Sequence, residues 1–263
     1  MNKKDNLNRP RLSVVLITLN EESGLKACLQ SLPENAEIIV MDSGSQDGTL
    51  DIAKTFNARI YSRSFDDFAS QKNAAIEKAR GSWILSLDAD EVLSPDLSDK
   101  IKEISESDQV EESGFSVGRR LVFLGRRMRF GKTRDFPLRF FKNGKGSFNN
   151  AIHEVLEVDG KTGCLKETMD HYSYRDLTDY FARFNRYTSQ VALNHFRQGR
   201  PRPYGVFFLI RPFIEFLNRY ILRLGFLDGY PGYCYALVSS LYAFIKYAKL
   251  VELHDRENPD IEG

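Results

Sequence analysis

The chain has 263 residues, of which 42% are hydrophobic, so it is long enough to bury one substantial domain and to carry a further segment. The formal net charge is only +1, and the three cysteines, Cys28, Cys164 and Cys234, lie far apart. This spacing excludes a disulfide framework and a cysteine-based metal site, and it favours reduced thiols on the cytosolic side of a membrane. The first ten residues are polar and charged, so we expect neither a signal peptide nor a membrane anchor there.

The near-zero net charge conceals one strongly basic segment. Residues 119–145 contain ten lysines or arginines and a single acidic residue, Asp135. Such a segment predicts an anionic partner. No helix-turn-helix, zinc finger or aromatic RNA-binding motif accompanies it, so we expect no nucleic acid, and an anionic glycan or an anionic membrane surface fits better.

The N-terminal part alternates between strands and helices. Apolar runs predict buried strands at residues 12–19, 36–41, 58–61 and 82–87. Helices are predicted between them, from Glu21 to Leu32, from near Thr49 onward, and from Phe68 to Arg80. This rhythm predicts right-handed crossovers and a mostly parallel sheet, and therefore an α/β fold. Short strands at 115–117, 121–124 and 137–141 would add an antiparallel part to a mixed sheet.

Two carboxylates follow the fourth strand in the sequence Asp88-Ala89-Asp90. Open α/β sheets bind ligands at the carboxyl ends of their strands. Carboxylates this close repel one another unless a cation lies beside them, and a divalent ion that also binds phosphate oxygens is one solution. The alternative is a solvated acidic turn before the helix that starts near Ser94.

Polar clusters occur at the other strand ends as well. The motifs, in chain order, are Thr18-Leu19-Asn20-Glu21, Asp42-Ser43-Gly44-Ser45-Gln46-Asp47-Gly48-Thr49, Gln71-Lys72-Asn73 and Asp88-Ala89-Asp90. Together they resemble the family-2 inverting glycosyltransferases of the GT-A fold, which use a DXD motif. The resemblance is close over residues 11–95. Residues 136–174 more loosely resemble the bacterial subgroup that builds the lipopolysaccharide inner core, including its β-1,4-glucosyltransferase.

The resemblance implies a donor site for a nucleotide sugar, with UDP-glucose the expected donor. The implied binding residues are Thr18, Asn20, Glu21, Asp42, Ser43, Gly44, Asp47, Lys72 and Asp88. From the residues alone, Asp42 could accept a hydrogen bond from a uracil imide or a ribose hydroxyl. Helix capping is the alternative role for Thr18, Asn20, Ser45 and Asp47, and solvation is the alternative for Lys72.

The metal site implied by the same resemblance consists of Asp90, Asp88 and His171, and its cofactor would be Mg²⁺ or Mn²⁺. Asp90 would be the more direct ligand, and Asp88 would contact the donor ribose or reach the metal through water. A hydrogen-bonded structural residue is the alternative role for His171.

Inverting transfer needs a base that takes the proton of the acceptor hydroxyl. We expect Glu154 to be this base. His153 is the alternative base, or it orients Glu154, since a His-Glu pair occurs at this place in the resembling family. Asp135 is a third candidate, but it is expected to pair with a neighbouring arginine.

The C-terminal part is aromatic and helical. An amphipathic helix is predicted from Leu177 to near Gly199, and a second one, from Tyr204 to Leu224, combines apolar residues with arginines. A third, Tyr233 to Ile245, is expected to be too short to cross a membrane. We expect these helices to lie in a membrane interface, and the alternative is that they pack on each other or form a dimer contact.

The sequence therefore predicts a GT-A catalytic domain at residues 10–175 and a helical, membrane-associating region at 176–263. The expected enzyme is a metal-dependent glycosyltransferase on the cytoplasmic face of a bacterial inner membrane, with an anionic glycolipid acceptor such as lipopolysaccharide core. The alternatives are a polyprenyl-phosphate sugar transferase and a catalytically silent GT-A adaptor. Whether the chain forms an oligomer is left open.

Overall fold

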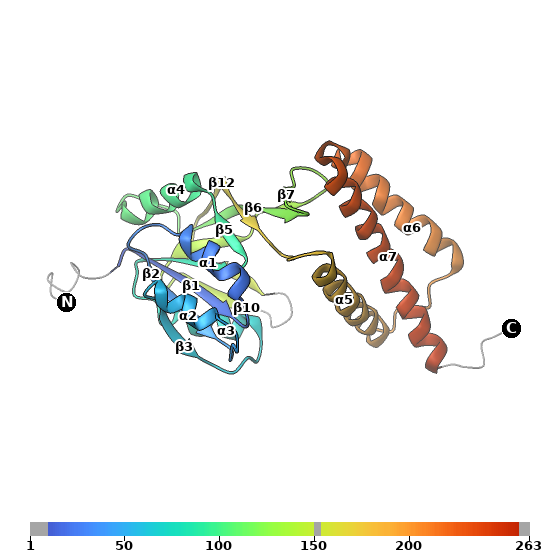
Figure 1. The fold of residues 1–263 in the computed structure, drawn as a ribbon, viewed down its shortest axis with the longest axis horizontal. Helices are drawn as coiled ribbons and strands as arrows, with labels where there is room; N and C mark the ends of the chain where they lie inside the picture. The colour runs from blue at the N-terminus through green and yellow to red at the C-terminus, as the bar shows by residue number, and fades with distance from the viewer. Residues whose placement is uncertain (1–9, 150–153, 258–263) are drawn as a thin grey trace. The chain divides into compact units, whose positions relative to one another are not determined.

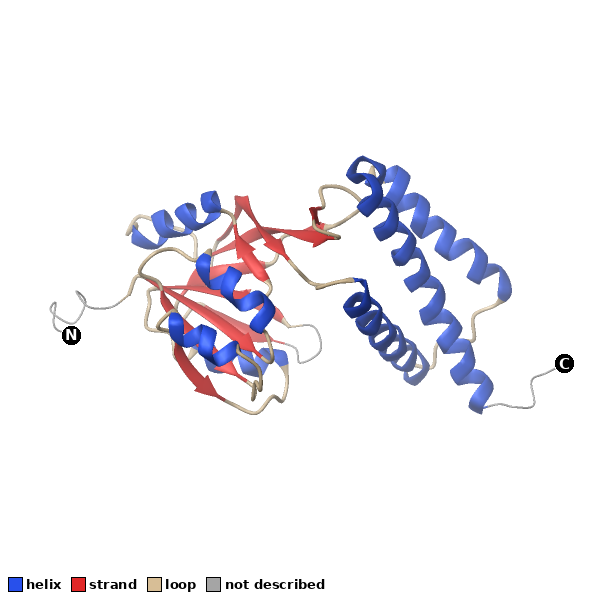
Figure 2. Cartoon of the chain, viewed as in Figure 1, coloured by secondary structure: helices blue, strands red, loops and turns tan. Residues whose placement is uncertain are grey.

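The computed structural model describes residues 10–149 and 154–257, which belong to two compact units (Figure 1). The first unit contains the chain up to Arg120 together with Asp135–Tyr172. The second contains Leu121–Arg134 and the chain from Ser173 onward. The sequence did not indicate that the short segment Leu121–Arg134 belongs with the C-terminal helices. Figure 2 shows that the first unit carries most of the strands, whereas the second is mainly helical.

The first unit begins with a parallel sheet. Its strands are β1 (Leu12–Thr18), β2 (Glu37–Asp42), β3 (Arg59–Ser62) and β4 (Trp83–Asp88). The connecting helices are α1 (Glu22–Gln30), α2 (Thr49–Thr55) and α3 (Phe68–Ile76), and α4 (Pro95–Glu106) follows. The strands are ordered β3-β2-β1-β4, and each neighbouring pair is parallel. The predicted alternation of strands and helices is therefore confirmed.

An antiparallel part extends this sheet from β4. The order continues β4-β9-β6-β12-β5, and two further short strands, β7 and β8, pair with β6. The strands are β5 (Glu91–Leu93), β6 (Gly114–Phe123), β7 (Arg126–Arg127), β8 (Arg134–Asp135), β9 (Leu138–Lys142) and β12 (Thr162–His171). A separate antiparallel pair consists of β10 (Gly146–Asn149) and β11 (Val155–Val158).

The two short strands predicted at 115–117 and 121–124 are one continuous strand, β6. The prediction of two separate strands was wrong, because the polar residues between them remain within the strand. The side chain of Arg119 is held there by an ion pair of 2.9 Å to Glu91, which is fully buried.

Both faces of the parallel sheet are covered by apolar side chains. Val14 and Leu16 of β1 belong to one core cluster, together with residues of α1, α2 and α4. Val15 points to the opposite face and belongs to the cluster that includes residues of α3. This alternation explains why β1 reads as an unbroken apolar run, since neighbouring residues of a strand face opposite sides.

The second unit consists mainly of three long helices. They are α5 (Leu177–Arg197), α6 (Gly205–Leu217) and α7 (Gly229–Glu257), with a π-helical turn η1 (Asn218–Leu222) and a 3₁₀ turn η2 (Gly225–Asp228) before α7. Helix α7 packs against both α5 and α6. Segment 121–134 is tied to η2, because the buried Asp228 carboxylate accepts hydrogen bonds from the backbone amides of Arg129 and Phe130.

The expectation that the last apolar helix is too short to cross a membrane was wrong. The apolar run at 233–245 is part of α7, a continuous helix of 29 residues. Within the described chain, residues 225–257 form one stretch that is long and apolar enough to cross, with 28% of its most apolar window buried inside the protein. The length and composition of this helix are compatible with membrane association.

The aromatic centre of the first unit provides a stability test. Phe140 is fully buried and stacks on Trp83 with ring centroids 4.7 Å apart. We expect Phe140→Ala to lower the free energy of unfolding by about 3–5 kcal/mol, because it leaves a cavity among packed rings. Trp83 is the single tryptophan of the chain, so denaturation followed by its fluorescence reports on this unit. The control Phe136→Ala removes a half-exposed ring and should change the free energy by about 0.5 kcal/mol or less. Equal effects of the two variants would contradict this account of the core.

Candidate active site

The carboxyl ends of β1, β2 and β4 meet at one edge of the sheet. Thr18 lies opposite Asp42 in the β1–β2 register, and Ile17 lies opposite Asp88 in the β1–β4 register. A cavity of about 280 Å³ opens at this edge. It is lined by Ile17, Thr18, Leu19, Glu21, Ser43, Phe65, Phe68, Asp88, Ala89 and Asp90. Five of the predicted site residues therefore share one cavity: Thr18, Glu21, Ser43, Asp88 and Asp90.

Asp42 organises the loop that follows β2. Its Oδ1 accepts hydrogen bonds from the hydroxyls of Thr18 and Ser45, and its Oδ2 accepts from the amides of Gly44 and Ser45. Burial by itself would raise the pKa of Asp42, but these hydrogen bonds outweigh burial and lower the pKa. Gly44 has a φ of 101°, which only glycine adopts without strain. In this structure both carboxylate oxygens of Asp42 are engaged within the loop.

Asn20 and Asp47 connect the loops that follow β1 and β2. The side-chain oxygen of Asn20 accepts from the amide of Gln46 at 2.8 Å. The Asp47 carboxylate accepts from the amides of Thr49 and Glu22. Asp47 thus bonds the first amide of α2, but the N-cap of α2 is Gly48 and that of α1 is Glu21, so none of Asp47, Thr18 and Asn20 is an N-cap residue. These contacts hold the rim of the cavity in a defined conformation.

Lys72 lies between two carboxylates. Its side chain is only 2% exposed, and its Nζ is 2.9 Å from Oδ1 of Asp88 and 3.1 Å from Oε1 of Glu154. The ammonium group also lies 5.2 Å from the centre of the Phe148 ring. The solvated alternative for Lys72 was therefore wrong, because α3 directs this side chain inward. Lys72 joins the predicted base to the first carboxylate of Asp88-Ala89-Asp90. His153 lies outside the described residues.

Two arginines complete a buried charge network. Arg139 of β9 donates to Asp88 Oδ2 at 2.7 Å and to Glu91 Oε1 at 3.0 Å. Arg119 bonds the same oxygen of Glu91 and forms two hydrogen bonds with Asp135. Burial alone would raise the pKa of Asp88, but the positive charges of Arg139 and Lys72 outweigh burial and hold that pKa well below its ordinary range. The expected pairing of Asp135 with a neighbouring arginine is confirmed.

Asp90 and His171 meet although 80 residues separate them in sequence. Strand β12 pairs antiparallel with β5, which places His171 opposite Glu91, and the amide of Tyr172 donates to the carbonyl of Asp90 at 2.9 Å. His171 Nε2 then lies 3.4 Å from Asp90 Oδ2. The other oxygen, Asp90 Oδ1, is buried without a hydrogen-bond partner among the described residues.

This arrangement fits a divalent cation in part. A carboxylate oxygen without a hydrogen-bond partner among the described residues and a neighbouring imidazole nitrogen are two ligands of the types that Mn²⁺ or Mg²⁺ binds. Burying such an oxygen costs free energy unless something binds it. Asp88, by contrast, is neutralised by Lys72 and Arg139. The described residues contain no cluster of three or more His, Cys, Asp or Glu side chains arranged to hold a metal.

Sequence reasoning missed Arg139, Glu91 and the two phenylalanines of the cavity. Glu91 directly follows Asp90, so a third carboxylate in the same turn was a signal that some cation had to lie nearby. Arg139 interrupts the apolar strand β9, and a lone arginine in a buried strand needs an anionic partner. Phe65 and Phe68 carried no such signal, because their position depends on the packing of the loop after β3.

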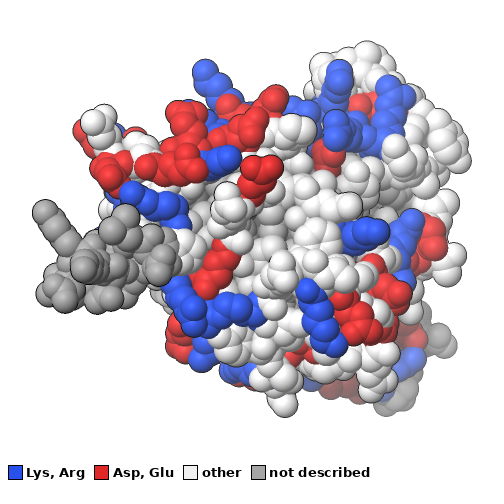
Figure 3. Space-filling view, turned by 60° about the vertical axis from the view of Figure 1, so that its left-hand side comes forward, with Lys and Arg blue, Asp and Glu red and all other residues white. Residues whose placement is uncertain are grey.

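The basic segment is less available to a partner than its composition suggested. Arg119 and Arg139 are occupied by the buried network, and Lys145 pairs with Asp159 at 2.6 Å. Figure 3 shows both signs of charge spread over the face that it displays, and not a single basic field. The excess of positive charge along residues 119–145 is therefore compensated in part by acidic residues from other segments.

The lowered pKa of Asp88 makes a prediction about acid stability. Because the folded pKa lies below the ordinary value of about 3.9, the ionised carboxylate stabilises the fold above that value, and this contribution is lost as the pH falls toward the folded pKa. Asp88→Asn should therefore lose less stability than the wild type between pH 5 and pH 3, although it is less stable at pH 7. Denaturation followed by Trp83 fluorescence at each pH measures this. The exposed Asp96→Asn should keep the wild-type slope, and an unchanged slope in Asp88→Asn would contradict the prediction.

Comparison with known proteins identifies relatives along nearly the whole chain. The model of glycosyl transferase family 2 matches residues 13–164. The lipopolysaccharide core biosynthesis glycosyltransferase LpsC of Rhizobium meliloti is 30% identical over 258 residues, which cover 92% of this chain and 93% of that protein. An uncharacterized glycosyltransferase of Rickettsia bellii is 28% identical over 263 residues, which cover 95% of this chain and 89% of that protein.

Among solved structures, Staphylococcus aureus TarS 1–349 in complex with UDP-GlcNAc aligns with 94% of this chain and 92% of its own, at 14% identity and a TM-score of 0.43. The mixed α/β sheet and the family match agree with the GT-A fold expected from the sequence. The match over more than half of the chain and the 30% identity to LpsC lead to one conclusion. This chain belongs to glycosyl transferase family 2 and is a glycosyltransferase.

Proposed function

We propose that this glycosyltransferase is a metal-dependent inverting enzyme that transfers glucose from UDP-glucose to a lipid-carried anionic glycan such as lipopolysaccharide core. The observation that carries the proposal is the convergence of Asp90, His171, Lys72 and Glu154 at one sheet edge beside a cavity. The similarity to LpsC supports the choice of acceptor class.

The cavity suits an elongated donor with an aromatic end and an anionic middle. Phe65 and Phe68 line it with rings that are about half exposed, and the two rings meet edge to face at 5.0 Å. A nucleobase gains stabilisation by stacking on such rings. Asp90 lies in the lining of the same cavity, so a diphosphate attached to the nucleoside would come close to the proposed metal ligands.

Asp90 and His171 are the residues that would hold the cation, with Asp90 Oδ1 supplying the unsatisfied oxygen. When bound, Mg²⁺ or Mn²⁺ would supply Lewis-acid stabilisation of the negative charge on the diphosphate leaving group. Asp88 is assigned a different role in this proposal. It anchors Lys72 and Arg139, and it would contact the donor ribose only with the edge that remains exposed.

Glu154 is proposed as the base that takes the proton of the acceptor hydroxyl as that oxygen attacks the anomeric carbon. Its side chain is 25% exposed, so it can meet an acceptor, while its Oε1 is held by Lys72 at 3.1 Å. The buried ammonium group therefore orients Glu154 relative to the carboxylates at the end of β4. His153 stays an alternative base.

The helical unit supports a location at a membrane, which the proposal places on the cytoplasmic face of the bacterial inner membrane. Helix α6 exposes large apolar side chains, including Ile210, Phe213 and Ile214. Apolar side chains beside arginines are typical of helices that lie in a lipid interface. A lipid-carried acceptor would then be reached from the membrane surface.

The base assignment is tested by Glu154→Gln. We expect sugar transfer to a hydroxyl acceptor to fall at least about 100-fold, since general-base catalysis contributes about 10²–10⁴. Binding of UDP, measured by calorimetry, should stay within about twofold. The matched control Glu157→Gln replaces an exposed carboxylate of β11 and should keep normal turnover. Near-normal turnover with a hydroxyl acceptor in Glu154→Gln would remove its assigned role. A wild type that glycosylates a polyprenyl phosphate but no hydroxyl acceptor, with that activity kept in Glu154→Gln, would favour a phosphate acceptor.

The metal assignment is tested by Asp90→Asn. We expect the Mn²⁺-dependent part of the UDP-induced rise in melting temperature to disappear, because the asparagine binds the cation far more weakly. Asp96→Asn, which changes an exposed carboxylate at the start of α4, should show the wild-type dependence on Mn²⁺. A full Mn²⁺ effect in Asp90→Asn would contradict the assignment.

A further inference from the structure

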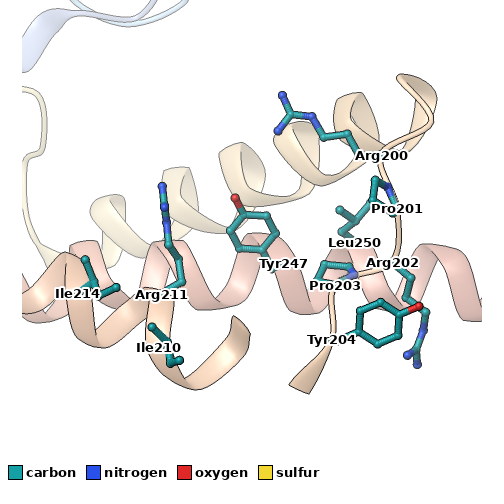
Figure 4. Close-up of a pocket in the computed structure, with 10 residues that line it drawn as sticks. All are labelled: Arg200, Pro201, Arg202, Pro203, Tyr204, Ile210, Arg211, Ile214, Tyr247 and Leu250. Carbon is teal, nitrogen blue, oxygen red and sulfur yellow. The ribbon is translucent and has the colours of Figure 1, made fainter. Parts of the chain in front are cut away.

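The second unit contains a groove that the proposed chemistry does not use. It has a volume of about 680 Å³ and lies among the loop that follows α5, helix α6 and helix α7 (Figure 4). Prolines 201 and 203, Ile210, Ile214 and Leu250 form most of its apolar lining. This volume lies within the range of pockets that bind small amphiphilic ligands, about 300–1,000 Å³.

Three arginines line the same groove, and they differ in how their charge is balanced. Arg202 forms an ion pair with Asp255 at 2.8 Å. Arg200 and Arg211 have no carboxylate within ion-pair distance in the described part of the chain. Figure 4 shows Tyr247 between these two arginines, with its hydroxyl and the Arg211 guanidinium pointing to the same side. Within residues 10–149 and 154–257, two guanidinium groups without a carboxylate partner thus flank an apolar groove.

The charges of this region affect one another. Burial, and after it the positive charge of Arg211, lowers the pKa of Lys246, and the negative charge of Glu215 offsets this only in part. The Lys246 ammonium lies 4.9 Å from the centre of the Tyr247 ring. Burial, followed by the charge of Arg200 and of Lys246, also lowers the pKa of His195. Like charges nearby lower the pKa of a cationic group, whereas an anion nearby raises it. An anion placed among Arg200, Arg211 and Lys246 would relieve this repulsion.

We propose that this groove binds one anionic phospholipid, with its phosphate held by Arg200 and Arg211 and an acyl chain against the apolar lining. Guanidinium groups bind phosphate through paired hydrogen bonds, and so they suit this head group. The apolar lining can pack against an acyl chain, whereas a free phosphate ion would make no contact with it. The groove also continues onto the exposed apolar face of α6, where Ile210 and Ile214 are about half exposed. The inference concerns the helical unit and does not depend on the donor, the metal or the base.

The test uses the full chain and native mass spectrometry with dihexanoyl phosphatidylglycerol below its micelle concentration. We expect it to bind at least tenfold more tightly than dihexanoyl phosphatidylcholine and than glycerophosphoglycerol, which has the phosphate but no acyl chain. The double variant R200Q/R211Q should weaken binding of the anionic lipid at least tenfold. The control R186Q/R197Q removes the same charge from exposed positions of α5 outside the groove lining and should bind as the wild type does.

Ile214→Gln tests the apolar half of the site at a half-exposed position, so it should fold normally and weaken lipid binding at least fivefold. Circular dichroism of each variant checks that the helices are intact. Undiminished binding by R200Q/R211Q, an equal loss in the control, or equal binding of glycerophosphoglycerol would overturn the proposal. The native mass spectra also report dimers. A dimer that persists when lipid is added but is lost in R200Q/R211Q would show that a second copy fills the groove. That result would also overturn the proposal.

Discussion

The buried ammonium group of Lys72 is the interaction on which the candidate site depends. It is almost completely removed from solvent and balances the carboxylates of Asp88 and Glu154, which lie 66 residues apart in sequence. Removing one member of a buried ion pair leaves an uncompensated charge and costs about 3–5 kcal/mol. Lys72 therefore connects the helix that follows β3 both to the end of β4 and to the segment that carries the proposed base.

Compensation of charge also explains why the two carboxylates of Asp88-Ala89-Asp90 are assigned different roles. Asp88 faces two cations from the protein, whereas Asp90 faces a histidine and has a buried oxygen that no described residue hydrogen-bonds. Two neighbouring aspartates with the same chemistry thus have different surroundings. The difference suits one structural and one metal-binding role, because a carboxylate that already faces two cations attracts a third one less.

In the described part of the helical unit, by contrast, some cations lie without a carboxylate to balance them. Among the described residues, two arginines of its exposed groove have no carboxylate within ion-pair distance, while other cations of the same unit, such as Arg202 and Arg219, are paired with Asp255 and Glu215. The proposed lipid-carried acceptor would require an active site held near a bilayer surface. An uncompensated pair of arginines beside apolar side chains would provide such an attachment, and it would also set the preference for anionic lipids.

The sequence alone determined the alternation of strands and helices, the burial of β1 on both faces, and the placement of Asp42 and Asp88 at strand ends. These features follow from residue patterns over about ten positions, which act locally. Tertiary structure decided that Arg139 meets Asp88, that Lys72 turns inward to Glu154, and that His171 reaches Asp90. It also decided that β6 is continuous and that α7 is one long helix. Contacts between residues 51 to 82 positions apart depend on which strands pair and which charges must be balanced when they are buried, and neither is encoded in the local pattern.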